Sequence, residues 1–274
     1  RLHAALEGKL PPYIQTLLDN CLETGNAYGK TALCDGLTAA IKKHEKKTDT
    51  LLFLGVDARY MVCEQAKKAI EVPESADADF TVLADEPASG AQLDFLIGAA
   101  NETKEQMTAA AKVLDSFKTV VVYDPNDAKA LKQLYKEYGV ELSCEVVTYT
   151  TYVAKLLKDG KLQPKDTGKT VVFQDPYQLS RDLGETEEPR EIIENYAVLG
   201  EMLLNRKETM WAGNILMAQY LPEVIDEVAR RRLFNAESIG ATAMVTASVS
   251  EYWALRHVKQ DKIEVLSIED LILG

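Results

Sequence analysis

The chain has 274 residues, of which 46% are hydrophobic and 27% charged, and its formal net charge at pH 7 is -12. That composition is typical of a folded protein of about two domains rather than a disordered chain. The negative charge disfavours nucleic-acid binding, and no apolar run approaches the roughly 20 residues that span a bilayer. The opening residues also lack the apolar region of a signal peptide. We therefore expect a cytoplasmic protein with no nucleic-acid partner and no membrane span. Because the chain begins at Arg1 without an initiator methionine, we also expect it to be a piece of a longer protein.

The first 49 residues are predicted to form a helical segment, with GNAYGK as a loop between two of its helices. At Thr50 the pattern changes to short apolar strands, which are typical of a parallel sheet covered on both faces. Strands and helices are then predicted to alternate over residues 50–55, 58–72, 79–84, 102–117, 119–123 and 127–139, with a last strand and helix within 141–160.

The same alternation begins again near residue 169, which indicates an internal duplication. The predicted fold is therefore α/β: two similar repeats with parallel sheets, related by a pseudo-two-fold axis and preceded by the helical segment. The predicted domains are residues 1–49, 50–160 and 168–274, with the polar stretch DGKLQPKDTG at the boundary between the repeats.

The cysteines and histidines are too dispersed to predict a metal site. No C-x-x-C pair occurs among Cys21, Cys34, Cys63 and Cys144. We expect these four to be buried free thiols of a cytoplasmic protein.

A second pattern recurs in both repeats at similar gaps. In the first repeat, Val56 follows the first strand, and the loop PASG and then the turn DPND come after it. In the second repeat, Tyr177, the loop MWAGN and the turn SVSE occupy the corresponding places. This resembles the cysteine-rich CCG domain, which occurs as a tandem pair in heterodisulfide reductase, the iron–sulfur subunit of glycolate oxidase and the C subunit of anaerobic glycerol-3-phosphate dehydrogenase. The segments LFLGVDARY, EPASGAQLDFLIG and QDPYQLSRDLGETEEPREII look like the surroundings of its cysteines, and the opening LEGKLPPYIQTLLDNCLETGNAYG looks like its helical linker.

The resemblance stops at the ligands, because none of the ten cysteine positions holds cysteine. The first vacated cluster site would comprise Val56, Ala88, Ser89, Asp124 and Asp127. The second would comprise Tyr177, Trp211, Ala212, Ser248 and Glu251. Iron–sulfur clusters are held by thiolates, so we expect no cluster and no other cofactor in this chain.

The carboxylates of DPND are interpreted as helix caps. Asp124 would be the N-cap, Pro125 the first helical residue and Asp127 an acid in the first turn. SVSE is predicted to form a capping box, and Asp175 of DPYQ a third cap. A divalent-metal or anion site and acid–base catalysis remain as alternatives. Arg181 and Arg190 are candidates for anion binding or for salt bridges.

Two further hypotheses concern the second site and the function. Tyr177 and Trp211 are predicted to face each other and fill the vacated space, with a surface anchor role for Trp211 as the alternative. The resemblance implies a cluster-free docking module in an electron-transfer complex, whose partners are its other subunits or domains. The alternatives are the body of a longer iron–sulfur oxidoreductase with its redox centres elsewhere, or a protein that binds a small ligand or metal in the vacated pockets.

Overall fold

A computed structural model describes residues 1–34, 36–258 and 262–274. It is an α/β structure with two parallel sheets, which confirms the predicted fold class. Helices precede the first strand, as expected: α1 (Leu2–Leu6), α2 (Pro12–Thr24) and α3 (Leu37–His44).

The contacts divide the chain into two compact units, residues 1–63 with 79–147 and residues 64–78 with 148–274. Residues 64–78 and 148–160 therefore belong to the second unit, although they lie in the first predicted repeat. The predicted domains are continuous ranges of sequence, whereas the two units are groups of residues that contact one another in space. Those boundaries and the pseudo-two-fold relation stay predictions.

The sheet of the first unit contains β1 (Thr50–Phe53), β2 (Thr119–Val122) and β3 (Glu145–Thr148) in that order. The predicted strand at 79–84 is reduced to one bridge, in which Thr81 pairs with Leu51 beside β1. The reason lies in the carbonyls of Leu83 and Ala84, which accept hydrogen bonds from the buried Arg59 guanidinium and so leave the ladder. With the Thr81 bridge counted as the second strand in the chain, the order along the sheet is Thr81, β1, β2, β3. In terms of chain order this is 2-1-3-4.

The sheet of the second unit has the same order. It contains β4 (Thr170–Gln174), β5 (Val198–Gly200), β6 (Ala243–Thr246) and β7 (Glu264–Ser267), arranged β5-β4-β6-β7 with every pair parallel. A repeated strand order is what an internal duplication predicts. In doubly wound sheets of this order, ligands bind at the carboxyl ends of the first and third strands, where the winding reverses.

Helices cover both sheets. The first unit contains α4 (Val56–Met61), α6 (Ala91–Ile97), α7 (Asn101–Leu114), α8 (Pro125–Lys129), the π-helical turn η1 (Ala130–Leu134) and α9 (Tyr135–Glu137). The second contains α5 (Cys63–Ser75), α10 (Tyr149–Lys158), the π-helical turn η2 (Gln178–Asp182), α11 (Glu188–Glu194), the 3₁₀ turn η3 (Arg206–Glu208), α12 (Ile215–Ala218), α13 (Pro222–Ser238), α14 (Val249–His257) and α15 (Ile268–Leu273).

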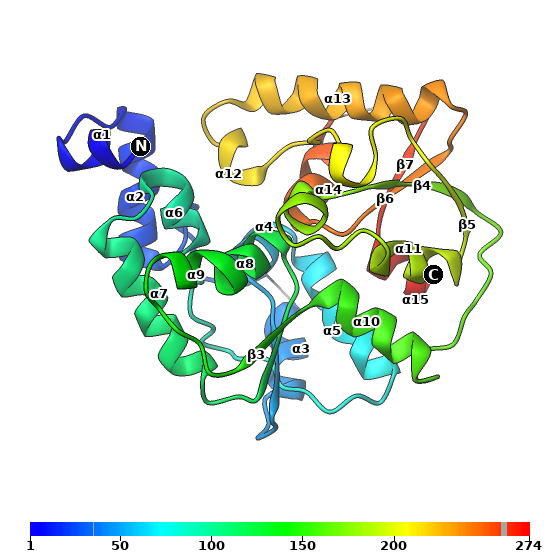
Figure 1. Cartoon of the computed structure of the whole chain (residues 1–274), viewed down its shortest axis with the longest axis horizontal. Helices are drawn as coiled ribbons and strands as arrows, with labels where there is room; N and C mark the ends of the chain where they lie inside the picture. Colours follow the sequence, from blue (N-terminus) through cyan, green and yellow to red (C-terminus); the bar gives the residue numbers. More distant parts are fainter. Residues whose placement is uncertain (35, 259–261) are drawn as a thin grey trace. The chain divides into compact units, whose positions relative to one another are not determined.

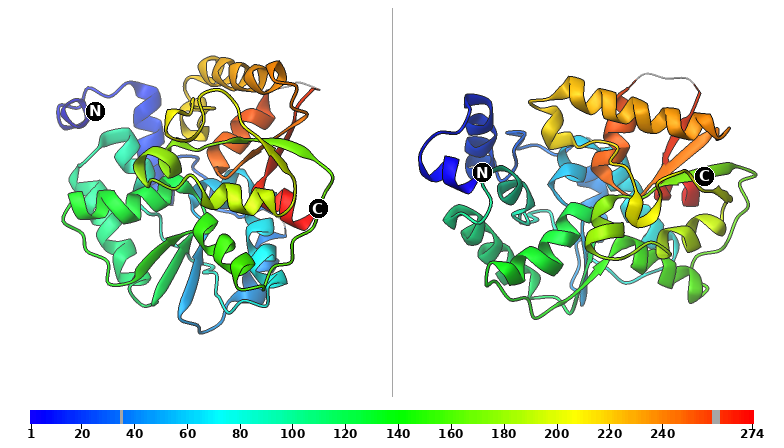
Figure 2. Two further views of the ribbon diagram at one scale, coloured as in Figure 1. Left: turned by 45° about the vertical axis from the view of Figure 1, so that its right-hand side comes forward. Right: turned by 45° about the horizontal axis from the view of Figure 1, so that its top comes forward.

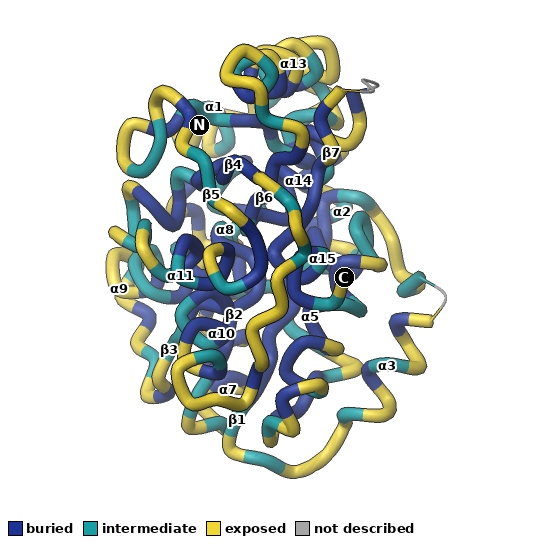
Figure 3. Tube along the Cα trace, turned by 90° about the vertical axis from the view of Figure 1, so that its right-hand side faces the viewer, coloured by how far each residue is buried: buried dark blue, intermediate teal, exposed yellow. Residues whose placement is uncertain are grey.

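In the second unit, α13 and α14 lie on one face of the sheet, and α11 and α15 lie on the other (Figures 1 and 2). This arrangement explains the continuous apolar strands, because both faces must be buried. Val171, Val172 and Phe173 of β4 are no more than 2% exposed, and Figure 3 shows the central strands as buried. Among the described helices, none is long and apolar enough to cross a membrane.

The prediction of four free thiols was half right. Cys21 and Cys144 are free and buried. Cys34 and Cys63 instead form a disulfide, with their Cα atoms 6.1 Å apart. They are 29 residues apart in the chain, so their spacing gave no sign of this contact.

Gly55 tests the packing at the end of β1. Its φ of 83° and ψ of 157° suit only glycine, and an added Cβ would collide with Asp127 Oδ2. Gly98 is a matched control: its backbone is similar, with φ of 74° and ψ of -146°, but an added Cβ would meet Leu2 at an ordinary 3.8 Å. We expect Gly98→Ala to cost about 1–3 kcal/mol of unfolding free energy in urea titrations, and Gly55→Ala to cost more.

The excess cost of Gly55→Ala should disappear when Asp127→Ala is added, because the colliding carboxylate is then gone. Equal costs for the two glycine substitutions would contradict the close contact between Gly55 and Asp127.

Candidate functional site

At the carboxyl end of β1, two backbone N–H groups are bound by a buried carboxylate. Leu54 N and Gly55 N donate to Glu86, each at 2.8 Å. The Glu86 side chain is 1% exposed, and Arg59 Nη1 lies 3.9 Å from it. Burial raises the pKa of Glu86, while the positive charge of Arg59 and the two backbone N–H groups oppose that rise. This carboxylate therefore supplies the acceptor that the end of the first strand requires.

Three of the five predicted positions of the first vacated site lie together beside this carboxylate. The Ser89 hydroxyl donates to Asp127 Oδ1, and the space above Gly55 is bounded by Asp127 and by the Cβ of Asp124. Val56 follows Gly55 as the first residue of α4, and the half-buried Ala88 precedes Ser89.

The predicted cap at Asp124 is confirmed. Its carboxylate accepts a hydrogen bond from Asn126 N at 2.7 Å, and Pro125 is the first residue of α8. Asp127 lies in the first turn, as expected, but it is buried and its pKa is raised well above the usual range. Burial is the main cause, the negative charge of Asp124 adds to it, and the Ser89 hydrogen bond opposes it.

The second site also has a buried carboxylate, at Glu251. Its Oε1 accepts from Ala212 N at 3.2 Å, and its Oε2 accepts from Gln174 Nε2 at 3.2 Å. Gln174 is the last residue of β4, and its Oε1 accepts from the fully buried Arg232 of α13. Burial raises the pKa of Glu251 to about 8, against the effect of the Ala212 N–H and of Gln174.

The predicted capping box at SVSE is half correct. Ser248 is the N-cap of α14 and accepts from Glu251 N at 3.3 Å. The return bond is missing, because the Glu251 carboxylate binds Ala212 and Gln174 instead, and Ser248 N donates to Thr246 Oγ1 at 3.3 Å. The Glu251 carboxylate therefore forms hydrogen bonds to residues distant in the sequence instead of to the cap residue of its own helix.

The predicted cap at Asp175 is wrong, since Tyr177 is the N-cap of the turn that follows. The Asp175 carboxylate accepts from Arg190 at 2.7 and 2.9 Å and from Arg206 N at 2.8 Å. Arg190 also donates to Glu201 at 2.7 and 3.0 Å. Arg190, one of the two candidates for anion binding, is thus bound by carboxylates of the chain itself.

Arg181, the other candidate for anion binding, donates to the carbonyl oxygens of Lys207 and Thr209. Both predicted anion-binding arginines therefore donate to protein acceptors. Tyr177 and Trp211 are each half-buried, and their packing against each other stays a prediction.

Sequence reasoning missed Glu86, Arg59 and Gln174 as members of these sites. Glu86 lies two residues before Ala88, so an acid at the edge of a predicted loop was the available signal. No group of three or more His, Cys, Asp or Glu side chains among the described residues is arranged to hold a metal ion. The chemistry these residues offer is proton binding at Glu251 and acceptance of backbone N–H groups by Glu86 and Glu251.

Two substitutions at Asp124 test its role as a helix cap. Asparagine caps a helix about as well as aspartate, so Asp124→Asn should change the unfolding free energy little, whereas Asp124→Ala should cost about 0.5–2 kcal/mol. Thermal and urea unfolding of both variants measure this. Equal destabilisation by the two substitutions would contradict the cap.

A second prediction concerns the pH dependence of stability. Because the pKa of Glu251 is raised on folding, its folded form binds more protons than the unfolded chain between about pH 4.5 and about pH 8. Its contribution to stability is therefore largest below that range and is lost as pH rises through it. One pKa unit corresponds to about 1.4 kcal/mol, so the loss should be measurable by urea unfolding at each pH.

Glu251→Gln should flatten this part of the profile, while the exposed Glu208→Gln should leave it unchanged. A profile as steep in Glu251→Gln as in the unsubstituted chain would exclude Glu251 as its source.

Comparison with known proteins finds distant iron–sulfur relatives. A protein named probable membrane-anchored ferredoxin, from Chromohalobacter salexigens, is 27% identical over 70% of this chain and 31% of its own length. A subunit of the fumarate reductase (CoM/CoB) of Methanothermobacter marburgensis is 22% identical over 49% of this chain and 27% of its own length. The probable iron-sulfur-binding oxidoreductase FadF from Bacillus subtilis is 26% identical over 63% of this chain and 25% of its own length. The chain thus spans less than a third of the length of these relatives.

No protein-family profile matches the chain. Among solved structures, an aspartate racemase homologue from Pyrococcus horikoshii covers 82% of this chain at 14% identity with a TM-score of 0.35. Glutamate racemase RacE1 from Bacillus anthracis covers 84% of it at 11% identity with a TM-score of 0.37. Scores this low support no argument about fold or function. The chain is therefore related, distantly, to iron–sulfur oxidoreductase-type proteins.

Proposed function

We propose that this chain is a cluster-free module of the CCG type, which serves as a structural and docking part of an iron–sulfur electron-transfer protein or complex of the heterodisulfide-reductase kind. Its partners are the redox-active subunits or domains of that assembly, and it carries no cofactor and catalyses no reaction by itself. The cytoplasmic location expected from the sequence belongs to this proposal, although the Cys34–Cys63 disulfide is less common in that compartment.

The observation that carries the proposal is the buried carboxylate at each site where the winding of the sheet reverses. Backbone N–H groups at such positions favour an anion. In a cluster-binding repeat the thiolates and the cluster would supply that negative charge. Here Glu86 binds Leu54 N and Gly55 N, and Glu251 binds Ala212 N. The Glu86 and Glu251 side chains thus supply hydrogen-bond acceptors where the cluster would lie, without its redox chemistry.

This chain aligns with only a small fraction of each relative's length, which supports redox centres located outside this chain. Only 25 to 31% of each of the three relatives described above aligns with this chain. An alternative is a metal or small-ligand site in the first vacated pocket. It has less support, because Asp127 and Glu86 accept hydrogen bonds from the protein itself, and Asp124 does so through Oδ1.

Restoring the cysteines tests the proposed origin of the site. One variant carries cysteine at Val56, Ala88, Ser89, Asp124 and Asp127, with Glu86→Ala to release the N–H groups. A matched control carries serine at the same five positions with the same Glu86→Ala. After anaerobic reconstitution with iron and sulfide, we expect only the cysteine variant to hold both elements and to show a sulfide-to-iron charge-transfer band.

The unsubstituted chain, purified anaerobically, should contain only trace iron. Stoichiometric iron in that protein would contradict the cluster-free state. A folded cysteine variant that holds no more iron than the serine control would contradict the CCG-type site.

The assembly is tested separately by anaerobic isolation of the tagged chain from its native source. We expect proteins that carry reducible iron–sulfur centres, detected by electron paramagnetic resonance, to co-purify in fixed proportion. Purification of the chain alone, or with proteins that lack redox cofactors, would contradict the docking role.

A further inference from the structure

A separate cavity of about 690 Å³ lies within the second unit, beside the edge strand β7. Its volume is in the range of small-molecule sites. Side chains from α5, α14, α15 and the segment that precedes β4 line it, and the apolar part of its wall includes Leu266 and Leu271. Neither vacated cluster site contributes a residue to this cavity.

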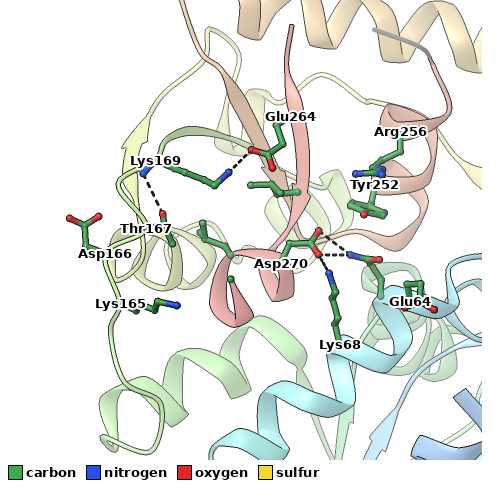
Figure 4. A pocket seen from close by; sticks show the side chains of 14 residues that line it. Glu64, Lys68, Lys165, Asp166, Thr167, Lys169, Tyr252, Arg256, Glu264 and Asp270 are labelled. Atoms are coloured by element: carbon green, nitrogen blue, oxygen red, sulfur yellow. Dashed lines mark hydrogen bonds and ion pairs between the residues drawn. The ribbon is translucent and has the colours of Figure 1, made fainter. Parts of the chain in front are cut away.

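The acidic side chains of this cavity already have cationic or N–H partners (Figure 4). Asp270 binds the Lys68 ammonium, accepts from Gln65 Nε2 at 2.9 and 3.0 Å, and accepts from Ser267 N at 2.8 Å. Glu264 pairs with Lys169. These contacts neutralise the two carboxylates that face the interior of the cavity.

The two remaining acids on the wall are also engaged. Glu64 pairs with Lys67 at 3.2 Å. Asp166 accepts from Gly168 N at 2.8 Å, and Figure 4 shows its side chain directed away from the cavity.

Two cations on the wall are not neutralised. Within the described residues, neither Lys165 nor Arg256 forms an ion pair with a carboxylate. Arg256 makes one long hydrogen bond, from Nη1 to Val265 O at 3.4 Å, and its guanidinium lies 5.7 Å from the centre of the Tyr252 ring. Figure 4 shows Lys165 on one side of the cavity and Arg256 with Tyr252 on the other.

We infer that this cavity binds a small organic dianion with an apolar middle section. One acidic group lies at Lys165, the other lies at Arg256, and the apolar section between them packs against Leu266 and Leu271. The chain as a whole carries a charge of -12, which repels anions. Binding therefore depends on these two local cations, and salt should weaken it.

Isothermal titration calorimetry with the whole chain tests this inference. The probes are the dicarboxylates glutarate, adipate and suberate, with hexanoate as a monoanion of similar length and 1,6-hexanediol as an uncharged analogue. We expect saturable binding of at least one dicarboxylate, weaker binding of hexanoate, and no binding of the diol. Because a hydrogen bond to a charged group contributes strongly to binding, Lys165→Ala and Arg256→Ala should each raise the Kd about tenfold.

Lys161→Ala removes an exposed lysine outside the cavity and is the matched control, which should leave the Kd unchanged. Lys165 and Arg256 are themselves exposed, so their substitution should not impair folding, and circular dichroism of each variant verifies this. The inference is overturned if no dicarboxylate binds, if the diol binds as well as the dicarboxylates, or if the Kd is the same in the two cavity variants and the control.

Discussion

Both units depend on how buried backbone N–H groups in the loops of the candidate sites find acceptors away from water. A buried N–H group without an acceptor costs about 1–3 kcal/mol. The first unit meets this need with Glu86 and the second with Glu251. In each unit the carboxylate is itself buried, and burial raises its pKa. The cost of an unpaired N–H group is thus replaced by the cost of a buried carboxylate.

The two units limit that cost in different ways. In the first, Arg59 lies 3.9 Å from Glu86, and its guanidinium also binds the carbonyls that end the pairing of Thr81 with β1. In the second, Gln174 stands between Glu251 and the buried Arg232 and hydrogen-bonds to both. The shared strand order together with different polar contacts is what we expect of an internal duplication whose two copies have diverged.

Local sequence patterns predicted most of the elements and two of the caps. The apolar runs that became β1, β2, β4 and β6 indicated strands covered on both faces, and D-P-N-D indicated the cap at Asp124. These succeed because strand burial and capping depend on residues close together in the chain.

The contacts that complete each site join residues far apart in the chain, and no local pattern predicted them. Glu251 and Gln174 are 77 positions apart, and Arg232 is 58 from Gln174. The same applies to the Cys34–Cys63 disulfide, and to Asp175, whose carboxylate serves Arg190 instead of its predicted role at the start of a helix.

The role of the two buried carboxylates is tested most directly by detecting their hydrogen bonds. Scalar couplings across hydrogen bonds can be measured by nuclear magnetic resonance between a backbone amide nitrogen and a side-chain carboxyl carbon. We expect couplings from Leu54 N and Gly55 N to Glu86 Cδ and from Ala212 N to Glu251 Cδ, with slow amide exchange at all three positions. Absent couplings together with rapid exchange of these amides with solvent would contradict this role.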